Sequence, residues 1–416
     1  MIKPYIATIM YLLILVGTAM AQSLNIDSCY VFATRNYPLI KQYELIEKTK
    51  EYTLSNAGKA YLPQVSLTAI EGYVFGDLPT IGASGDGSNF KFIGIGQINQ
   101  TIWDGGATKT KKKIINAQSE TDKANVDVAM HDLRSRVNQL YFGILLIDEQ
   151  LKQLEIQNTI LSNNINRIKQ LNDNGLAYKT DVDEIRVEQL KLNQQKKEFN
   201  YTRNGYVMIL SVLIGQKINE QVILQKPQVS NQYSDQQIIR PELSFYKSQR
   251  NLLIAQSDVQ HVNLMPKIGL LGAGVLIAPG VSLGNSNMSS FGILGLSASW
   301  NIGALYKNSN EKELKQQSLL KLNVTEETFL FNTNMQLTQT SANIEKQKAV
   351  LSDDEEIVNL RKTIREGYQL KYNTGISPLL DFLNATEKES EARGQKALHE
   401  MQLLMTLYDY KTISGN

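Results

Sequence analysis

Apolar residues recur at spacings of four and three along much of the stretch from Gly106 to Leu171. The row pauses at Asn158, and its members are Leu133, Val137, Leu140, Ile144, Ile147, Leu151, Leu154, Leu161, Ile165, Ile168 and Leu171. Such a heptad seam is typical of coiled-coil packing. A helix over 106–171 would be about 100 Å long, whereas globular helices average about 11–12 residues. The pattern therefore predicts a strut or a wall rather than part of a globule.

A turn ends this long helical pattern, and a second helical pattern follows. Asn174 and Gly175 tolerate the left-handed backbone that leaves a helix. Thr180 and Asp181 suit the first turn of a return helix, which we expect over 180–214.

The same sequence of signals occurs later in the chain. A proline-free pattern over 306–372 predicts a second long helix, and Asn373 and Gly375 end it. Ser377 and Pro378 then begin a last helix over 377–412, with the proline at an early helical position.

Two pairs of segments predict strands, and the first segment, 64–76, is rich in Val, Thr, Ile, Tyr and Phe. Segments 64–76 and 91–103 form one expected hairpin (64–103), and 268–277 and 291–302 form the other (267–302). Polar Gly-containing loops join each pair. The lengths suit transmembrane hairpins, which need about 9–11 tilted residues per strand. Because the alternation of polar and apolar residues is incomplete, an ordinary soluble hairpin stays open as the alternative.

Three landmarks of the first half return about 200 positions later. Their offsets are 375 − 175 = 200 for Gly175, 266 − 63 = 203 for Pro63 and 300 − 103 = 197 for Trp103. This agreement predicts a duplicated helix–hairpin–helix–helix unit. The first repeat would cover 22–215 and the second 241–416, and the polar, irregular segment 216–240 would link them.

Shorter helical patterns open both repeats. The first covers Leu24 to Ala60 and is broken by Pro38, with Asp27 as a candidate cap. The second covers Pro241 to Val262.

The N-terminus has the features of an export signal. Lys3 precedes an apolar run from Tyr5 to Val16, and the A-x-A site ends at Ala21. This order predicts a signal peptide over 1–21, because the run is too short to span a membrane comfortably. The single cysteine, Cys29, is interpreted as a buried helix residue; a lipid attachment site is the alternative.

Four strands cannot close a barrel, and an open sheet edge is not tolerated in lipid. If the hairpins lie in a membrane, several identical chains must complete the barrel, and three copies would supply 12 strands. Pro63 and Pro266 suit the change from helix to strand. Trp103 and Trp300 end the two returning strands, so they suit an aromatic girdle at the membrane interface; core tryptophans at a corner are the alternative.

Composition and motifs argue against catalysis and nucleic-acid binding. The chain has 416 residues and a formal net charge of +2, without a basic block interleaved with aromatics. His131, His261 and His399 are scattered, and no metal-binding, phosphate-binding or acid–base motif is recognisable. The acidic run at 353–356 is interpreted as a solvated helix face. We expect a protein that is not an enzyme and has no metal or other cofactor.

Taken together, the chain resembles the TolC family of outer-membrane efflux channels over essentially its whole mature length. The motifs that carry the resemblance, besides the A-x-A signal, are Tyr61-Leu62-Pro63, Leu264-Met265-Pro266, Trp103-Asp104-Gly105-Gly106, Asn174-Gly175 with Thr180-Asp181-Val182, and Tyr372-Asn373-Thr374-Gly375 with Leu380-Asp381-Phe382-Leu383-Asn384-Ala385. Each motif is weak alone, but the ordered, duplicated set is specific.

The resemblance implies a mainly α-helical fold with transmembrane β-structure. A homotrimer would form a 12-stranded barrel among outer-membrane lipids, and a long helical tunnel would project into the periplasm. The linker would belong to an equatorial belt. Such a channel meets a periplasmic adaptor and an inner-membrane pump, and it passively conducts drugs, toxic compounds or proteins outward in tripartite efflux or type I secretion.

The family also assigns roles to the two turns. They would be adaptor-docking tips, formed by Asn174, Gly175, Leu176, Asn373, Gly375 and Ile376. Residues beside them would close a periplasmic aperture, namely Thr180, Asp181, Tyr372, Asp381 and Asn384. Tyr372 matches the family's tyrosine, but Ser377 replaces its basic residue and Asn384 its second acid, which argues against a salt-bridge latch.

Asp181 and Asp381 lie six residues after their glycines, so a trimer would place six carboxylates near one constriction. The alternative is that both are first-turn acids stabilised by the helix dipole. Two other protein classes also remain as alternatives. A periplasmic adaptor has one long hairpin rather than two, and a structural coiled-coil protein would lack the four strands.

Overall fold

The computed structural model describes residues 24–73, 75, 90–175, 177–228, 237–279 and 289–416. The predicted signal peptide lies outside these residues. The chain divides into two compact units. One unit contains residues 1–40, 127–241 and 329–416, and the other contains residues 41–126 and 242–328. Two very long helices belong to both units, α4 (Ala107–Asp173, 67 residues) and α7 (Ala304–Asn373, 70 residues).

The first unit packs helices against one another. It contains α2 (Ile26–Asn36), α5 (Lys179–Ile214) and α8 (Leu379–Ser414), together with the C-terminal parts of α4 and α7. The predicted seam of α4 is confirmed, since Val137, Ile144 and Ile168 are fully buried. The predicted boundaries of all four long helices agree with the structure to within two residues.

Helix α2 begins differently from the prediction. Asn25, not Asp27, is the N-cap, and its side-chain oxygen accepts a hydrogen bond from the Ser28 amide at 2.7 Å. Asp27 lies in the first turn, because the helix begins at Ile26, two residues earlier than a cap at Asp27 would allow. Cys29 is fully buried in the core of this unit, as predicted, and burial raises the pKa of its thiol to about 12.

The described part of the linker is fastened to this unit. Leu24 forms a parallel β-bridge with Leu224, and the buried Tyr141 hydroxyl lies 2.8 Å from the Leu24 carbonyl oxygen. The Arg203 guanidinium pairs with Asp148 and donates to the Val222 carbonyl oxygen at 2.7 Å. These bonds satisfy backbone groups that an irregular segment would otherwise leave unpaired.

The second unit joins helices to a sheet. Its helices include α3 (Gln42–Gly58) and α6 (Pro241–Asn263), and the 3-10 turns η1 (Pro38–Lys41) and η2 (Lys59–Tyr61) flank α3. The break predicted at Pro38 therefore lies between α2 and α3, where proline cannot continue the helical ladder.

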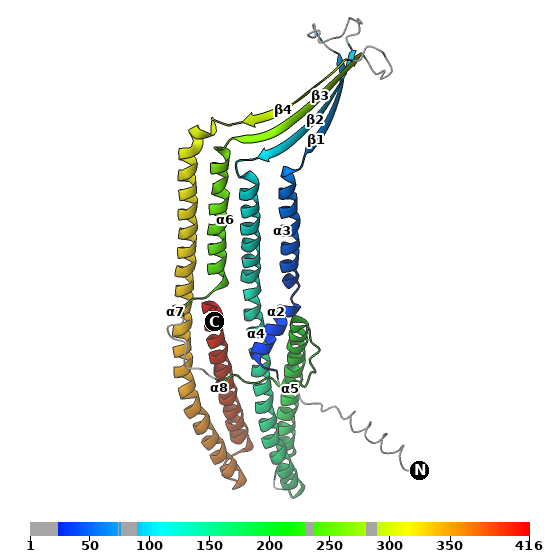
Figure 1. The fold of residues 1–416 in the computed structure, drawn as a ribbon. Coiled ribbons are helices and arrows are strands. Elements are labelled where there is room, and N and C mark those ends of the chain that lie inside the picture. Colours follow the sequence, from blue (N-terminus) through cyan, green and yellow to red (C-terminus); the bar gives the residue numbers. More distant parts are fainter. Residues whose placement is uncertain (1–23, 74, 76–89, 176, 229–236, 280–288) are drawn as a thin grey trace, which may run out of the picture. The chain divides into compact units, whose positions relative to one another are not determined.

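The sheet has four antiparallel strands in sequence order, side by side in Figure 1. They are β1 (Gln64–Tyr73), β2 (Phe90–Trp103), β3 (Lys267–Pro279) and β4 (Ser289–Ser299). The two predicted hairpins thus join through β2 and β3. Gly76, the predicted end of the first strand, lies outside the described residues.

Strand β4 ends three residues before its predicted end at Ile302. Its last residue, Ser299, pairs with Lys267, the first residue of β3. The preceding residue, Pro266, has no amide hydrogen, so the ladder stops there. On the other side of β3, strand β2 has a bulge between Thr101 and Trp103. Past the bulge, Trp103 pairs with Ile268.

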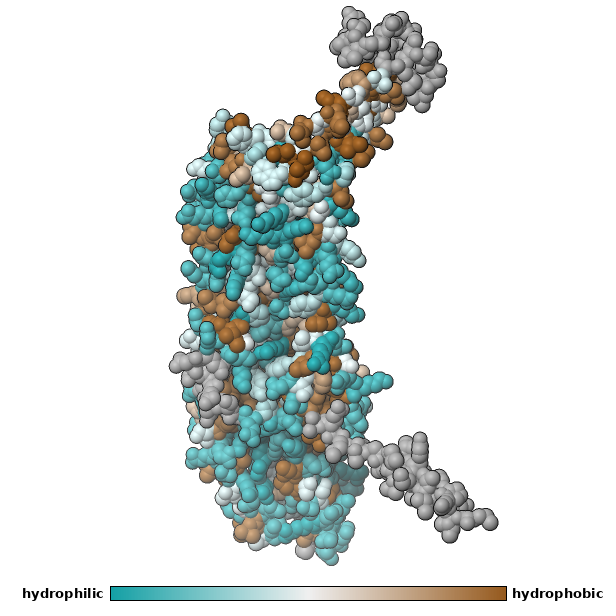
Figure 2. Space-filling view, in the orientation of Figure 1, coloured by the Kyte–Doolittle hydropathy of each residue, from teal (hydrophilic) through white to brown (hydrophobic). Residues whose placement is uncertain are grey.

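The strands expose apolar side chains. Leu67 and Leu294 are both 84% exposed, and Figure 2 shows hydrophobic surface over the strands and largely hydrophilic surface over the helices. The large exposed apolar residues of β1 and β4 are Val65, Leu67, Ile70, Tyr73, Phe291, Ile293, Leu294 and Leu296. Among the described helices, none is both long and apolar enough to cross a membrane.

Candidate functional site

The first turn lies between α4 and α5. Gly175 adopts a left-handed backbone with φ of 73°, as predicted, and its amide donates to the Asn172 carbonyl oxygen at 2.9 Å. Asn174 is exposed beside it, and Leu176 lies outside the described residues. Asp181 is the third residue of α5, and its carboxylate accepts a hydrogen bond from the Tyr178 amide at 3.1 Å.

The second turn, between α7 and α8, repeats this backbone. Gly375 has φ of 74°, and Ile376 is 74% exposed. Pro378 is the N-cap of α8 rather than an early helical residue, since its backbone is still extended. Asp381 is again the third helical residue, but its carboxylate accepts a hydrogen bond from the Ser377 hydroxyl at 2.6 Å.

The two turns meet within the first unit. Arg167 of α4 donates to the backbone oxygen of Asn373 at 3.3 Å. The rings of Tyr372 and Phe382 stack with centroids 6.4 Å apart, and both belong to a shared apolar cluster. Burial raises the pKa of Tyr372, the charge of Asp181 raises it further, and Arg167 opposes both. The charge of Asp181, on the first hairpin, thus acts on Tyr372, on the second.

Thr180 and Asn384 line one groove between the hairpins. Its apolar floor contains Leu161, Val187, Leu380 and Leu383. Its acidic lining residues are Asp183, Glu184, Glu188 and Glu387. The sequence reasoning missed these acids, although their 3–4 residue spacing on α5 places Glu184 and Glu188 on one helix face.

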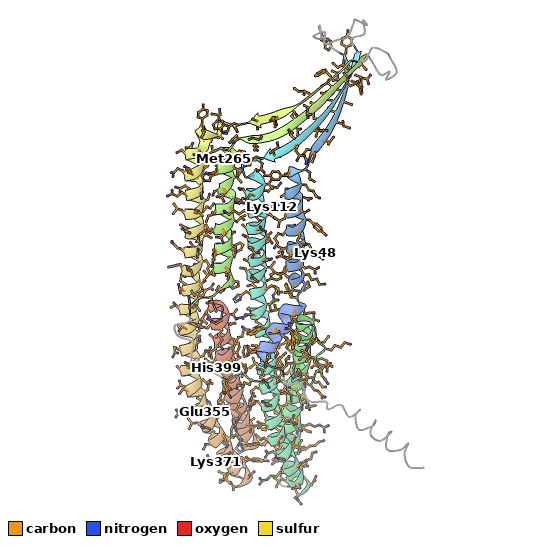
Figure 3. The ribbon with its side chains drawn as sticks, in the orientation of Figure 1. Lys48, Lys112, Met265, Glu355, Lys371 and His399 are labelled. Carbon is orange, nitrogen blue, oxygen red and sulfur yellow. The ribbon has the colours of Figure 1, made fainter. Side chains whose placement is uncertain are left out.

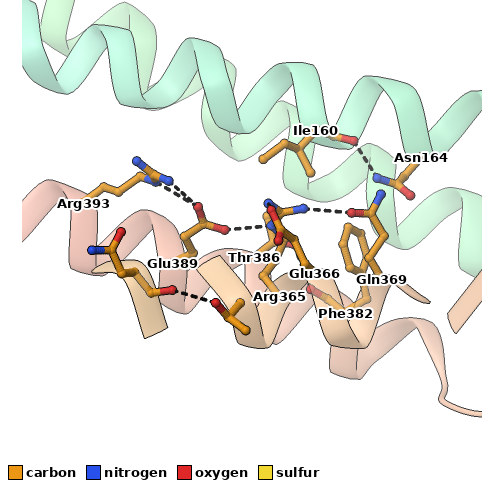
Figure 4. Close-up of polar contacts among 11 residues, drawn as sticks. Ile160, Asn164, Arg365, Glu366, Gln369, Phe382, Thr386, Glu389 and Arg393 are labelled. Carbon is orange, nitrogen blue, oxygen red and sulfur yellow. Dashed lines mark hydrogen bonds and ion pairs between the residues drawn. The ribbon is translucent and has the colours of Figure 1, made fainter. Parts of the chain in front are cut away.

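A buried ion cluster lies beside the second turn and was also missed. Glu389 of α8 is 4% exposed, and its carboxylate accepts hydrogen bonds from Arg365 of α7 at 2.8 Å and from Arg393 at 2.7 and 2.9 Å (Figure 4). Arg365 also donates to Gln369 at 2.8 Å. Burial by itself would raise the pKa of Glu389, but the hydrogen bonds from Arg365 and Arg393 lower it below its usual value.

The acidic run at 353–356 is not simply a solvated face, which corrects the prediction. Asp354 is 7% exposed and lies 2.6 Å from Nδ1 of His399. Glu355 pairs with Lys396, so two consecutive acids of α7 meet a basic pair on α8; Figure 3 labels His399 and Glu355 on this hairpin. The physical reason is that α8 places the Lys396 ammonium and the His399 ring opposite these two acids.

The other two histidines are on separate helices, α4 and α6. The His131 ring contacts the Thr412 carbonyl oxygen at 2.7 Å, and His261 is exposed at the end of α6. Within the described residues, no group of three or more His, Cys, Asp or Glu side chains is arranged to hold a metal ion.

Comparison with solved structures gives similar chains of the same architecture. The outer-membrane channel OprN matches with a TM-score of 0.66 at 14% identity, covering 94% of this chain and 90% of its own. VceC, an outer membrane protein of Vibrio cholerae, matches with 0.65 at 13%, covering 94% and 96%. The CmeC outer membrane channel of Campylobacter jejuni matches with 0.61 at 14%, covering 94% and 85%. The chain has the fold of these outer-membrane channels. No family model and no curated protein sequence matches it.

In this channel fold the helix–strand junctions are well defined. Pro63 and Pro266 each stand directly before a strand, β1 and β3. Trp103 ends β2 and is 42% exposed, and Trp300 follows β4 and is 59% exposed, so neither is a core residue of the described chain. The indole of Trp300 donates to the Leu264 carbonyl oxygen at 3.0 Å.

Asp104 fixes the first junction. It is 7% exposed, and its carboxylate accepts hydrogen bonds from the Tyr61 hydroxyl at 2.9 Å and from the amides of Gly106 at 2.9 Å and Thr108 at 2.6 Å. Although burial alone would raise it, these bonds hold the pKa of Asp104 at about 2. The carboxylate thus caps α4 where β2 ends.

Proposed function

We propose that this chain is the outer-membrane exit duct of a tripartite efflux or type I secretion system. It conducts small toxic compounds or proteins passively, without catalysis or a cofactor, from a periplasmic assembly to the exterior. The observation that carries the proposal is the joining of a four-stranded apolar sheet to two helical hairpins built on 67- and 70-residue helices. Solved chains with this fold are outer-membrane channels.

The functional form is a homotrimer built from duplicated repeats. In the described residues β1 and β4 each pair with one strand, so both sheet edges are open. Lipid does not tolerate open edges, and β1 of one copy next to β4 of another would close a 12-stranded barrel. Helix α7 also exposes an apolar stripe suited to a neighbouring helix, formed by Leu320, Val324, Phe331 and Met335.

The lipid contact is the exposed apolar sheet, with Trp103 and Trp300 at the interface. Both indole rings are partly solvent-accessible at the ends of returning strands. The helical hairpins then project into the periplasm, and the fastened linker belongs to their equatorial belt.

The adaptor docks at the two turns and in the groove beside them. The apolar floor at Leu161 and Leu383 suits the apolar face of a helix, and the acids at Glu184 and Glu387 suit a basic flank. This charge pattern favours an adaptor segment rich in Lys or Arg, and the pump is reached directly or through that adaptor.

Asp181 and Asp381 form the cation-attracting ring of the aperture, with Thr180, Tyr372 and Asn384 beside it. Both carboxylates also accept local hydrogen bonds, Asp181 from the Tyr178 amide and Asp381 from the Ser377 hydroxyl. Each carboxylate is the third residue of its helix and is held by one of these bonds, so the local bonds are compatible with a role in the ring. A hydrogen-bonded closure through Tyr372 replaces a salt-bridge latch.

Membrane fractionation and planar-bilayer recording test the proposal together. The mature chain is expected in the outer membrane as a heat-modifiable trimer that forms pores, and Asp181→Asn with Asp381→Asn should weaken block by divalent cations. Recovery as a soluble monomer without pore activity would refute the channel. Unchanged block in a pore-forming double variant would leave both acids with their local hydrogen bonds as their only role.

A further inference from the structure

The Arg365–Glu389–Arg393 cluster occupies a core position of the second hairpin. On α8, Phe382, Thr386 and Glu389 are all at most 4% exposed and follow one another at spacings of four and three. Glu389 therefore replaces an apolar residue in the seam that faces α7. Among the described residues, Arg365 is its one partner from the other helix, because Arg393 is on α8 itself.

The cluster is close to the candidate aperture on both helices. Glu389 is eight residues after Asp381 (389 − 381), about 12 Å along α8. Arg365 is seven residues before Tyr372 (372 − 365), about 10 Å along α7. The Tyr372–Phe382 ring stack and the Arg365–Glu389 pair thus form two successive contacts across the same helix pair.

The two contacts differ in how well they define register. Apolar side chains in a seam accept several neighbours, so a helix pair can slide and repack. A buried carboxylate with a cross-helix guanidinium partner resists sliding, because any other register separates Glu389 from Arg365, whose side chain is only 12% exposed, and leaves the carboxylate with Arg393 of its own helix alone. Single buried polar residues are known to fix the register of coiled coils in this way.

We propose that Glu389, held by Arg365 and Arg393, is a positioning residue for the periplasmic aperture. It fixes the height of α8 against α7, so that Tyr372 and Asp381 stay in the closed arrangement and move only as one body. This inference rests on the proposed channel function. It adds to that function a device outside the aperture that sets how often the channel opens.

The test uses trimers of the full mature chain in planar bilayers. Glu389→Gln keeps shape but removes the charge, and we expect the open fraction at low voltage to rise at least about tenfold. Glu389→Asp keeps the charge and should recover most of the closed behaviour. The matched control is Glu355→Gln, which breaks a pair between the same helices whose carboxylate is 62% exposed, and it should change opening by less than about twofold.

Gating of Glu389→Gln trimers equal to wild type would overturn the inference. If that variant does not assemble, Arg393→Gln is the deciding variant. It removes one of the two guanidiniums that pair with Glu389, and the Arg393 side chain is 29% exposed, so the change is milder for folding. Raised opening would support the inference and unchanged opening would overturn it.

Hydrogen exchange separates this inference from the proposed function. In the full chain, Glu389→Gln should accelerate amide exchange on both sides of the second turn, and Glu355→Gln should not. If wild-type trimers form no pores, the proposed function fails, yet unchanged exchange in Glu389→Gln would independently overturn the positioning role.

Discussion

The two hairpins share a turn and differ in what stabilises it. Gly175 and Gly375 have φ values of 73° and 74°, and each is followed six residues later by an Asp at the third position of its helix. In hairpin α4–α5 the partly buried ion pair between the helices is Arg203–Asp148, with Arg203 22 residues beyond Asp181 (203 − 181), about 33 Å along α5. In hairpin α7–α8 a buried ion cluster lies at Glu389, eight residues beyond Asp381 (389 − 381), about 12 Å along α8.

The same backbone turn thus occurs in two hairpins whose stabilising contacts near the tip differ. The first tip is held by apolar packing and by a backbone-to-carboxylate cap. The second has a hydroxyl-to-carboxylate bond in place of that cap, and it also has an aromatic stack and the Glu389 cluster. We therefore expect the first tip to open locally more readily than the second.

The largest effect is expected at Phe382, the residue directly after Asp381. Val182, directly after Asp181, has the equivalent position in the first hairpin. Phe382→Ala empties a fully buried site and should lower the free energy of unfolding by about 3–5 kcal/mol. Val182→Ala, at a partly buried position, should lower it by less than about 2 kcal/mol. Denaturant unfolding of the mature chain measures both. Leu380→Ala, at a residue 56% exposed, is the control, and equal losses at Phe382 and Leu380 would contradict the packing assignment.

Acid should loosen the second hairpin through Glu389. Its folded-state pKa is lowered, so its contribution to stability is present above the unfolded pKa of about 4.3 and is lost as pH falls through the folded value. Between pH 6 and pH 3, wild type should lose more thermal stability than Glu389→Gln, by circular dichroism. Glu155→Gln, at an exposed pair with Lys196 in the first hairpin, should behave like wild type. An identical acid response in wild type and Glu389→Gln would contradict this.

The two glycines offer a matched pair with a smaller effect. A Cβ at either would meet open space, so the cost of Gly175→Ala and Gly375→Ala is the left-handed backbone alone, about 1–2 kcal/mol each. Thermal unfolding should show equal losses. A difference above about 0.5 kcal/mol would show that the surrounding hairpin, not the turn, sets the cost.

The smallest effect is expected at the hydrogen bonds that Asp181 and Asp381 accept. Ser377→Ala removes the hydroxyl that donates to Asp381 and should cost about 0.5–1 kcal/mol. Tyr178→Phe keeps the backbone amide that donates to Asp181 and should be neutral within about 0.5 kcal/mol. Equal stability of the two variants in chemical denaturation would remove this difference between the tips.

Periodicity was enough to predict the long helices and their buried seam. Val137, Ile144 and Ile168 lie where the heptad places them, because helix geometry alone sets which residues share a face. Gly175 and Gly375 were predictable for the same local reason, since leaving a helix needs a left-handed residue.

Contacts between helices were not predictable from the sequence. Arg365 and Glu389 are 24 positions apart (389 − 365), and Asp354 and His399 are 45 apart (399 − 354). Their meeting depends on the register of α7 against α8, which periodicity leaves open. Residues 353–356 therefore read as a solvated run, although Asp354 is buried against α8. The candidate aperture residues were located by resemblance, and their roles stay predictions.

The central pairing of the sheet has a consequence for how the chain folds. Strands β2 and β3 join Trp103 to Ile268 (268 − 103 = 165) and Lys91 to Pro279 (279 − 91 = 188), whereas β1 and β2 are neighbours along the chain. Pairing across so many residues is slow, because loop closure has to precede the contacts that reward it. During synthesis the β1–β2 hairpin is complete long before β3 exists, and its unpaired β2 edge is a template for aggregation. The chain is therefore most vulnerable between the completion of β2 and the arrival of β3.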